Sequence, residues 1–426
     1  MKFESKIYPN IVENNRQIRL YLLDFVTVTQ LQRNDVPNFV EKIEPLIPEI
    51  IEYYGEELYS IQIILEHSFE SIPLIIDGKH FFELIHLICE KYSISPKLFN
   101  YHTGNWRIHE LYSSWKADVF PDAEPMQMTC AMSLQRLYAP NIEQIPNAQG
   151  QQPNIAHCDS YSTESKSYVY NCLNRAPHIH RLHVFDQLHK RNLLDQGMVS
   201  MNEIKEQSSN YWGRISSDTV ALLPMTLDVP KGSSAIDHIY RDAMPQAFQE
   251  IESKTYDTIP NAFAHIFDNS MVSLVTETNL GIPVHPELCC DCGGTMLPTH
   301  HNNHAECVSC NAVKQLPNWM QWHQHAFITE KTWRCMLNRH PVLWISAPNT
   351  AKTMQHLGFK TFDSVWSEHY DSIQNPIERI DAVLDILKQL TDQSPSERSH
   401  TLSLLKPILE HNHHMMMTLR YPQLLT

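Results

Sequence analysis

The sequence predicts an α/β protein of two units with a helical C-terminal segment. Short apolar runs typical of buried strands alternate with helical patterns, as in proteins built on parallel sheets. The clearest case is 326–362, where a helix over 330–338 precedes the apolar strand 342–345 and a second helix ending near His356. Residues 140–167 are rich in Pro, Asn, Ser and Thr, which is the composition of a loop and predicts the boundary between the units.

The first unit, residues 1–150, carries strand patterns at 61–65 and 73–78 and a largely apolar helix at 81–92. Asp77 and His102 are polar residues at strand ends, where parallel sheets bind ligands. They are therefore the candidates for acid–base chemistry. Alternatively, the residues after His102 form an ordinary Gly-Asn turn with no functional role.

The second unit, residues 161–390, places polar residues at two strand ends. Asn174 and Arg175 follow the strand 168–173, and the next helix carries Arg181. A guanidinium group matches phosphate geometry, so these arginines could bind a diphosphate; they could equally be solvated groups on an amphipathic helix. Glu277 follows the strand 271–275, where it would contact a ligand or cap a helix.

A third polar group, Thr329-Glu330-Lys331, begins the helix in the stretch 326–362. A carboxylate in the first turn of a helix complements the helix dipole, which is a sufficient structural reason for Glu330. Alternatively, Glu330 accepts hydrogen bonds from a ribose diol while Lys331 meets a phosphate at the same helix start.

The triplet 329–331, followed by His340-Pro341 and an apolar strand, resembles the donor-binding motif of family 10 fucosyltransferases and of phage-type fucosyltransferase-like glycosyltransferases. The segments FKTFDSVWSEHYD (359–371) and SYVYNCLNRAPHIHRLHVFDQLHKRNLLDQGMVS (167–200) are similar to the phage-type proteins as well. The resemblance covers roughly the C-terminal half. It implies that Glu330 holds a nucleotide ribose, that Lys331 holds a phosphate, and that Arg175 or Arg181 neutralises the donor diphosphate.

This resemblance implies two Rossmann-like domains of the GT-B-like type, facing a cleft. The second unit would bind a nucleotide-sugar donor and the first an acceptor, so the predicted function is that of a glycosyltransferase. The chain has no Asp-x-Asp sequence for a divalent cation, which fits neutralisation of the diphosphate by Arg175, Arg181 and Lys331. The alternative is a non-catalytic assembly protein that keeps a degenerate transferase fold and makes protein contacts through a zinc ribbon.

The zinc ribbon is predicted from Cys289-x-x-Cys292 and Cys307-x-x-Cys310 within the segment 282–318. Two such pairs form a tetrahedral four-thiolate site, which leaves no open position and makes the zinc structural. Cys290, His300, His301 or His304 could replace one thiolate. The resemblance does not include this insertion, which could bind a protein partner.

Composition limits the classes of partner and compartment. The formal net charge of −15 and the lack of any Lys/Arg-rich block argue against direct binding of nucleic acid. The chain has only 11 glycines and neither a GxGxxG nor a P-loop pattern, so side chains and helix starts must bind any phosphate. No apolar run is long enough to span a bilayer, and MKFESKIYPN is not a secretory signal. We therefore expect a cytoplasmic protein, located in the host cytoplasm if a virus encodes it.

The C-terminal segment 391–426 has helical spacing, with Pro407 predicting a kink or a division. His411, His413 and His414 precede three methionines. This run is more typical of a helix surface with core methionines than of a metal-binding tract.

Overall fold

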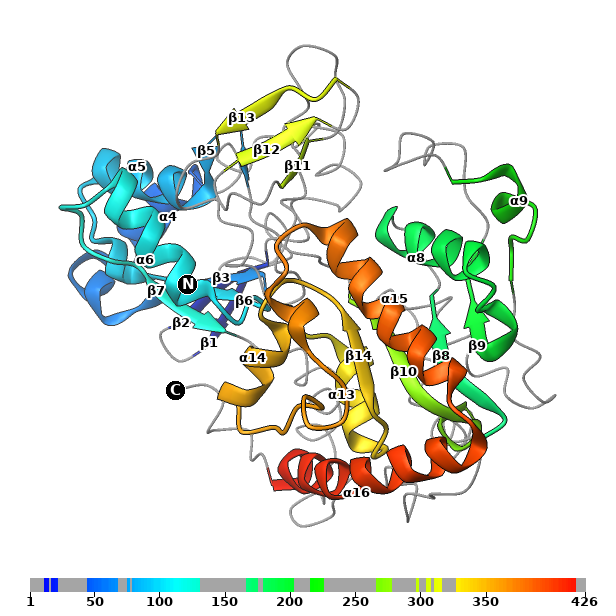
Figure 1. Cartoon of the computed structure of the whole chain (residues 1–426). Helices are drawn as coiled ribbons and strands as arrows, with labels where there is room; N and C mark the ends of the chain where they lie inside the picture. The colour runs from blue at the N-terminus through cyan, green and yellow to red at the C-terminus, as the bar shows by residue number, and fades with distance from the viewer. Residues whose placement is uncertain are drawn as a thin grey trace. The chain divides into compact units, whose positions relative to one another are not determined.

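The computed structural model of the chain comprises two compact units (Figure 1). One groups Met1–Ser133 with Gly281–Ile328 and Pro422–Thr426, and the other groups Leu134–Leu280 with Thr329–Tyr421. The structure describes residues 11–14, 17–21, 44–67, 75–76, 79–130, 166–174, 179–202, 215–225, 266–277, 296–298, 304–307, 310–315 and 327–418. Asp77, Arg175, Cys289 and Cys292 lie outside these residues, and so do Cys290, His300 and His301.

Unit 1 is built on a five-stranded sheet of order β1-β2-β3-β6-β7. The strands are β1 (Ile11–Asn14), β2 (Gln17–Tyr21), β3 (Gln62–His67), β6 (Phe99–Thr103) and β7 (Gln127–Cys130). β1 and β2 form an antiparallel hairpin, whereas β2, β3, β6 and β7 run parallel to one another. A separate two-stranded antiparallel sheet is formed by β4 (Ile75–Ile76) and β5 (Lys79–His80).

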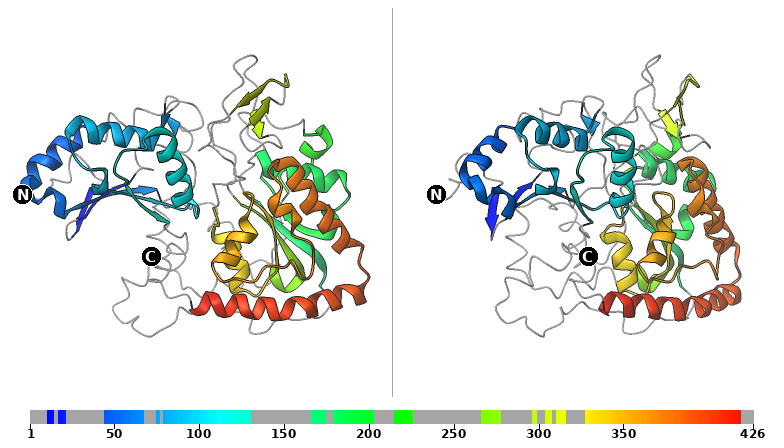
Figure 2. Two further views of the ribbon diagram at one scale, coloured as in Figure 1. Left: turned by 60° about the vertical axis from the view of Figure 1, so that its left-hand side comes forward. Right: turned by 90° about the vertical axis from the view of Figure 1, so that its left-hand side faces the viewer.

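Three helices cover one face of this sheet, as Figure 2 shows: α4 (Leu46–Tyr54), α5 (Phe81–Tyr92) and α6 (Ile108–Val119). Short 3-10 turns, η1 (Gly55–Ser60) and η2 (Pro96–Leu98), precede β3 and β6. Alternate strand residues, such as Ile63 with Leu65 and Phe99 with Tyr101, join the apolar core under the helices. Strand periodicity therefore selects the buried face.

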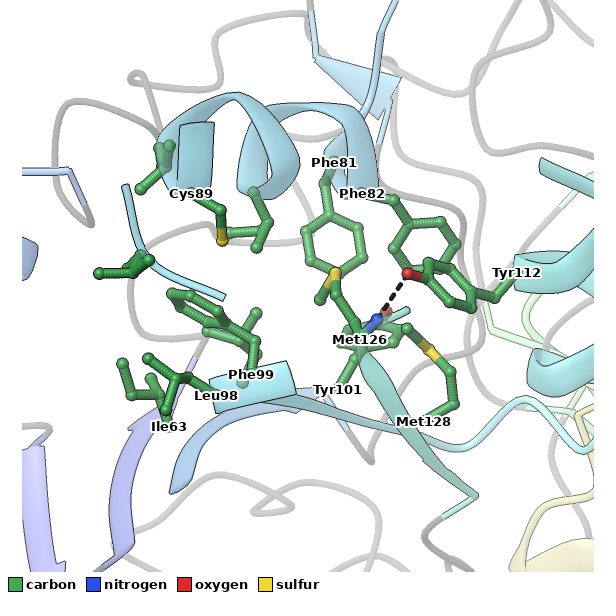
Figure 3. Packing of buried hydrophobic residues seen from close by; sticks show 14 of the residues in the cluster. Ile63, Phe81, Phe82, Cys89, Leu98, Phe99, Tyr101, Tyr112, Met126 and Met128 are labelled. Carbon is green, nitrogen blue, oxygen red and sulfur yellow. Dashed lines mark hydrogen bonds between the residues drawn. The ribbon is translucent and has the colours of Figure 1, made fainter. Parts of the chain in front are cut away.

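The centre of this core is aromatic (Figure 3). The Phe82 ring meets the Tyr112 ring edge to face, with 5.0 Å between centroids. The Tyr112 hydroxyl accepts a hydrogen bond from the Met126 backbone N–H at 2.7 Å and lies 3.0 Å from His86 Nε2. Burial, followed by the charge of Lys116, lowers the pKa of His86 to about 4. These contacts tie α5, α6 and the start of β7 together.

Unit 2 contains a four-stranded, fully parallel sheet of order β14-β10-β8-β9. Its strands are β8 (Tyr168–Leu173), β9 (Gly197–Ser200), β10 (Ser270–Thr276) and β14 (Val342–Ile345). Every residue of β10 and β14 is buried, as expected where helices cover both faces of a parallel sheet. The prediction of an α/β protein with parallel strands is confirmed.

The described helices of unit 2 are α8 (Ile179–Lys190), α9 (Ser217–Val220), α13 (Glu330–Leu337), α14 (Thr350–His356), α15 (Pro376–Asp392) and α16 (Pro395–Thr418), with 3-10 turns η3 (Leu194–Gln196) and η7 (His369–Ser372). α15 packs over β14, and α16 packs along α13 (Figures 1 and 2). Asn375 caps α15 by accepting hydrogen bonds from the N–H groups of Ile377 and Glu378. Within the described chain, no helix has the length and apolar character needed to cross a bilayer.

Three local predictions were wrong or incomplete. The apolar composition of residues 220–224 predicts a strand, but these residues lie in the end of α9 and the turn that follows it. The buried Asp186 carboxylate accepts hydrogen bonds from Ser216 N–H and the Thr219 hydroxyl, which fixes a helical turn there. The pattern before Gly197 predicts that a helix stops there, but Gly197 also begins the strand β9. The helix α16 continues through Pro407 and is not divided there.

The segment between β10 and α13 contains a small antiparallel sheet of order β11-β12-β13. Its strands are β11 (Met296–Pro298), β12 (His304–Cys307) and β13 (Val313–Gln315). By chain order it lies between two elements of unit 2, β10 and α13. By contacts it belongs to unit 1, because Cys307 joins the core of that unit and Ala312 packs against it.

Candidate functional site

The carboxyl end of β10 gathers most of the polar residues that the sequence singled out. β10 lies between β8 and β14, and its last residue Thr276 pairs with Ile345. The next residue, Glu277, extends the ladder by donating its N–H to the Ile345 carbonyl at 2.9 Å. The side chains around Thr276 and Glu277 come from β8, α8 and α13.

Glu277 connects this strand end to the start of α13. Its side chain is 0% exposed. The carboxylate accepts hydrogen bonds from Thr329 N–H at 3.1 Å, from the Thr329 hydroxyl, and from the Thr332 hydroxyl at 2.6 Å. A carboxylate that receives N–H and O–H groups at a helix N-terminus satisfies donors the helix cannot pair internally and complements the helix dipole. Glu277 therefore positions the segment 329–332.

Lys331 faces the same carboxylate. Its Nζ lies 3.9 Å from Glu277 Oε2 and donates to the Thr329 hydroxyl at 3.1 Å, with 18% of the side chain exposed. The ammonium group is thus held at the end of β10, and part of the Lys331 side chain remains open to solvent. Glu330 is the first residue of α13, and its side chain lies outside the described residues.

Arg181, in the first turn of α8, approaches the strand end from another helix. It is 5% exposed, and its Nη2 donates to the Thr276 carbonyl at 3.5 Å. The neighbouring His180 Nε2 lies 2.8 Å from the Glu277 carbonyl, so this nitrogen carries the proton and donates it. No sequence pattern singled out His180, because nothing local signals a bond to a residue 97 positions away.

Asn174 joins three strands at this edge. Its backbone N–H donates to the carbonyl of Ser200, the last residue of β9, at 3.0 Å, and its side-chain oxygen accepts from the Thr276 hydroxyl. The amide nitrogen donates to Cys172 Sγ at 3.2 Å. Asn174 consequently has a fully defined position between β8, β9 and β10.

The neighbouring strand end, at β14, is arranged differently. The Asp371 carboxylate accepts the N–H groups of Ala351 at 2.9 Å and Lys352 at 3.1 Å, at the start of α14. Arg379, fully buried behind it, donates to the Ser346 carbonyl at 2.9 Å. Burial lowers the pKa of Arg379 to about 9 and raises that of Asp371. The start of α14 is occupied by the chain's own carboxylate, a feature that no local pattern signalled.

The structure therefore brings Asn174, Arg181, Glu277, Thr329 and Lys331 together at one sheet edge. His102 is part of β6 in unit 1. Cys307 and Cys310 lie at the end of β12 and just after it. The described residues hold no group of three or more His, Cys, Asp or Glu arranged for a metal ion, but Cys289 and Cys292 are not among those residues.

In chemical terms, the edge offers a guanidinium and an ammonium group against two consecutive residues, Thr276 and Glu277. Two cations held by one strand end suit a ligand with neighbouring negative charges. Comparisons with protein-family models, with curated proteins and with solved structures found no match to this chain.

Proposed function

We propose that the chain is a glycosyltransferase that transfers a sugar from a nucleotide-sugar donor to an acceptor. The donor diphosphate would bind at the carboxyl end of β10. The observation that carries this proposal is the approach of Arg181 from α8 and Lys331 from α13 to the consecutive residues Thr276 and Glu277. Ligands of open parallel sheets bind at such strand ends.

The sugar-transfer reaction mainly requires positive charge at a fixed position beside the leaving diphosphate. The bond between the sugar and the diphosphate breaks, the acceptor oxygen bonds to the sugar carbon, and the nucleoside diphosphate leaves. Arg181 and Lys331 would stabilise the negative charge that develops on this leaving group. Glu330 would accept hydrogen bonds from the ribose, and Arg175 would add a further positive charge. The acceptor proton would pass to a base from unit 1, for which Asp77 and His102 are the candidates.

The architecture is compatible with the proposal. Each unit has a sheet with parallel strands and helices packed on it, as a Rossmann-like domain also has. On this basis the two units would be the Rossmann-like domains of a GT-B-like enzyme. Unit 2 would bind the donor and unit 1 the acceptor.

A second function is favoured by the burial of Glu277. Its carboxylate faces Lys331 and bonds to Thr329 and Thr332, so the fold itself uses part of the charge and the hydroxyl groups at this edge. An assembly protein that retains a degenerate transferase fold would need this network only for stability. Such a protein would bind no nucleotide there.

Thermal unfolding with a panel of nucleoside diphosphates and nucleotide-sugars separates the two functions. The enzyme should be stabilised by at least one nucleoside diphosphate and its sugar conjugates, and Lys331→Ala should abolish that stabilisation. Lys352→Ala is the matched control, because this exposed lysine on α14 is near another strand end and should leave the stabilisation intact. Stabilisation by no member of the panel would leave the assembly protein as the function.

A further inference from the structure

Two backbone hydrogen bonds join the residues on either side of the turn after β12. Asn311 N–H donates to the Cys307 carbonyl at 2.9 Å, and Cys307 N–H donates to the Ala312 carbonyl at 2.8 Å. Asn311 has φ of 59°, a left-handed conformation that Asn tolerates better than most residues. Cys307 and Cys310 thus lie in one tight reverse turn, with the two-residue spacing that zinc sites use.

The length of the connecting chain allows the other cysteine pair to reach the same end of the sheet. Met296, the first residue of β11, pairs with Cys307, the last residue of β12. Partner residues on antiparallel strands are about 5 Å apart. Cys292 precedes Met296 by four residues, which reach at most about 14 Å and include Gly293 and Gly294. The chain is therefore long enough for Cys289-x-x-Cys292 to reach the turn that contains Cys307 and Cys310.

The described strands of this small sheet are too short to form a core of their own. Its strands are three or four residues long, and every residue of β13 is exposed, with Val313 at 61%. Such short strands do not bury enough apolar surface to be stable alone, and small domains of this kind use metals or disulfides in place of a core. Cys307 and Ala312 anchor one end of the sheet to the core of unit 1.

We propose that Cys289, Cys292, Cys307 and Cys310 bind one zinc ion as four thiolates at the end of the β11-β12-β13 sheet. Four protein sulfurs complete a tetrahedral shell, so the ion is structural. His304 is not a ligand in this arrangement. It begins β12 opposite Gln315, three residues and about 10 Å along the strand from Cys307. The proposal does not depend on the glycosyltransferase function.

Metal analysis of the full-length chain, purified without chelators, tests the site directly. We expect one zinc per chain. Exchange for cobalt(II) should give the visible bands of tetrahedral coordination together with thiolate-to-cobalt charge transfer. A chain that contains no zinc and yields no such cobalt spectrum, or one that contains iron instead, overturns the proposal.

A variant pair assigns the ligands. Cys310→Ser replaces an exposed residue, so it should fold and yet lose its zinc to a chelator that leaves the wild type loaded. Cys130→Ser, in β7, is the control and should keep the zinc. Circular dichroism verifies that both variants are folded. Retention of zinc by Cys310→Ser with an unchanged cobalt spectrum contradicts the proposed ligand set.

Discussion

The Glu277 carboxylate accepts hydrogen bonds from both the backbone N–H and the hydroxyl of Thr329, 52 residues further along the chain. The two residues belong to the same unit, and the intervening segment 281–328 belongs to the other. The pair therefore attaches the start of α13 to the sheet edge at which Lys331 is held. This contact fixes the position of the Lys331 ammonium group, and any ligand that binds Lys331 depends on that position.

Replacing Glu277 by Gln should destabilise unit 2 by about 1–3 kcal/mol. The amide keeps one acceptor oxygen, but it loses the charge facing Lys331 and turns an N–H group toward a hydroxyl donor. Urea unfolding followed by tryptophan fluorescence measures the change. Asp392→Asn, which removes an exposed ion pair with Lys388, should cost about 0.5 kcal/mol or less. Equal effects of the two variants would contradict the buried role of Glu277.

Gly197→Ala should destabilise the β8–β9 pair. A Cβ at Gly197 would clash with the ring of the buried Tyr170. That ring is held in place because its hydroxyl donates to the Leu193 carbonyl at 3.1 Å. Overpacking of this kind costs about 1–3 kcal/mol. In a double-mutant cycle, Tyr170→Leu should relieve the clash, so that both changes together cost less than the sum of the single ones. Strict additivity would show that the ring and Gly197 do not interact.

Glu368→Gln should stabilise the protein above neutral pH. Burial raises the pKa of Glu368 to about 7, so the folded chain holds a proton that the unfolded chain releases between about pH 4.5 and 7. The contribution of Glu368 is therefore fully present below pH 4.5 and is lost as the pH rises through 7. Gln stays neutral and can still accept the Phe362 N–H bond.

The advantage of Glu368→Gln in unfolding free energy should thus grow with pH and reach up to about 3 kcal/mol near pH 8. Denaturant titrations at several pH values provide the measurement. Glu378→Gln, at an exposed position of α15, is the control and should show no comparable growth. A pH-independent difference for Glu368→Gln would rule out the raised pKa.

His340 should make unit 2 acid-sensitive. The buried ring accepts from the Ser273 hydroxyl at Nδ1 and donates from Nε2 to the Ser270 carbonyl, both at 2.9 Å. Burial lowers its pKa to about 4, so only the unfolded chain gains a proton as the pH falls from about 6.5 to 4. Stability is lost across that window, by up to about 3 kcal/mol for this group.

Imidazole NMR signals of histidine-labelled protein report this titration directly. The signal that disappears in His340→Asn should stay in the neutral form down to about pH 4. The variant should also lose part of the acid dependence of unfolding between pH 6.5 and 4. Titration of that signal near the ordinary histidine pKa would refute the prediction.

Local patterns predicted the elements whose apolar spacing is unambiguous, such as the strands at 168–173 and 342–345 and the helix at 81–92. The run Val220-Ala221-Leu222-Leu223 fits a helix as well as a strand, and hydrogen bonds from Ser216 and Thr219 to the distant Asp186 decide between them.

The candidate site was likewise predicted only where local patterns suffice, and not where distant contacts decide. The rule that polar residues gather at strand ends located Asn174, Arg181 and Lys331. It did not reveal that His180 bonds to the Glu277 carbonyl or that Asp371 occupies the start of α14, because both contacts join residues far apart in sequence.

The hydrogen bonds between Glu277 and Thr329 have a practical consequence for dissecting the protein. Glu277 and Thr329 flank the segment 281–328 and are in contact, so a short linker of glycines and serines can replace that segment. A shortened gene with this linker would encode unit 2 as an uninterrupted polypeptide. Nucleotide binding could then be measured on unit 2 without unit 1.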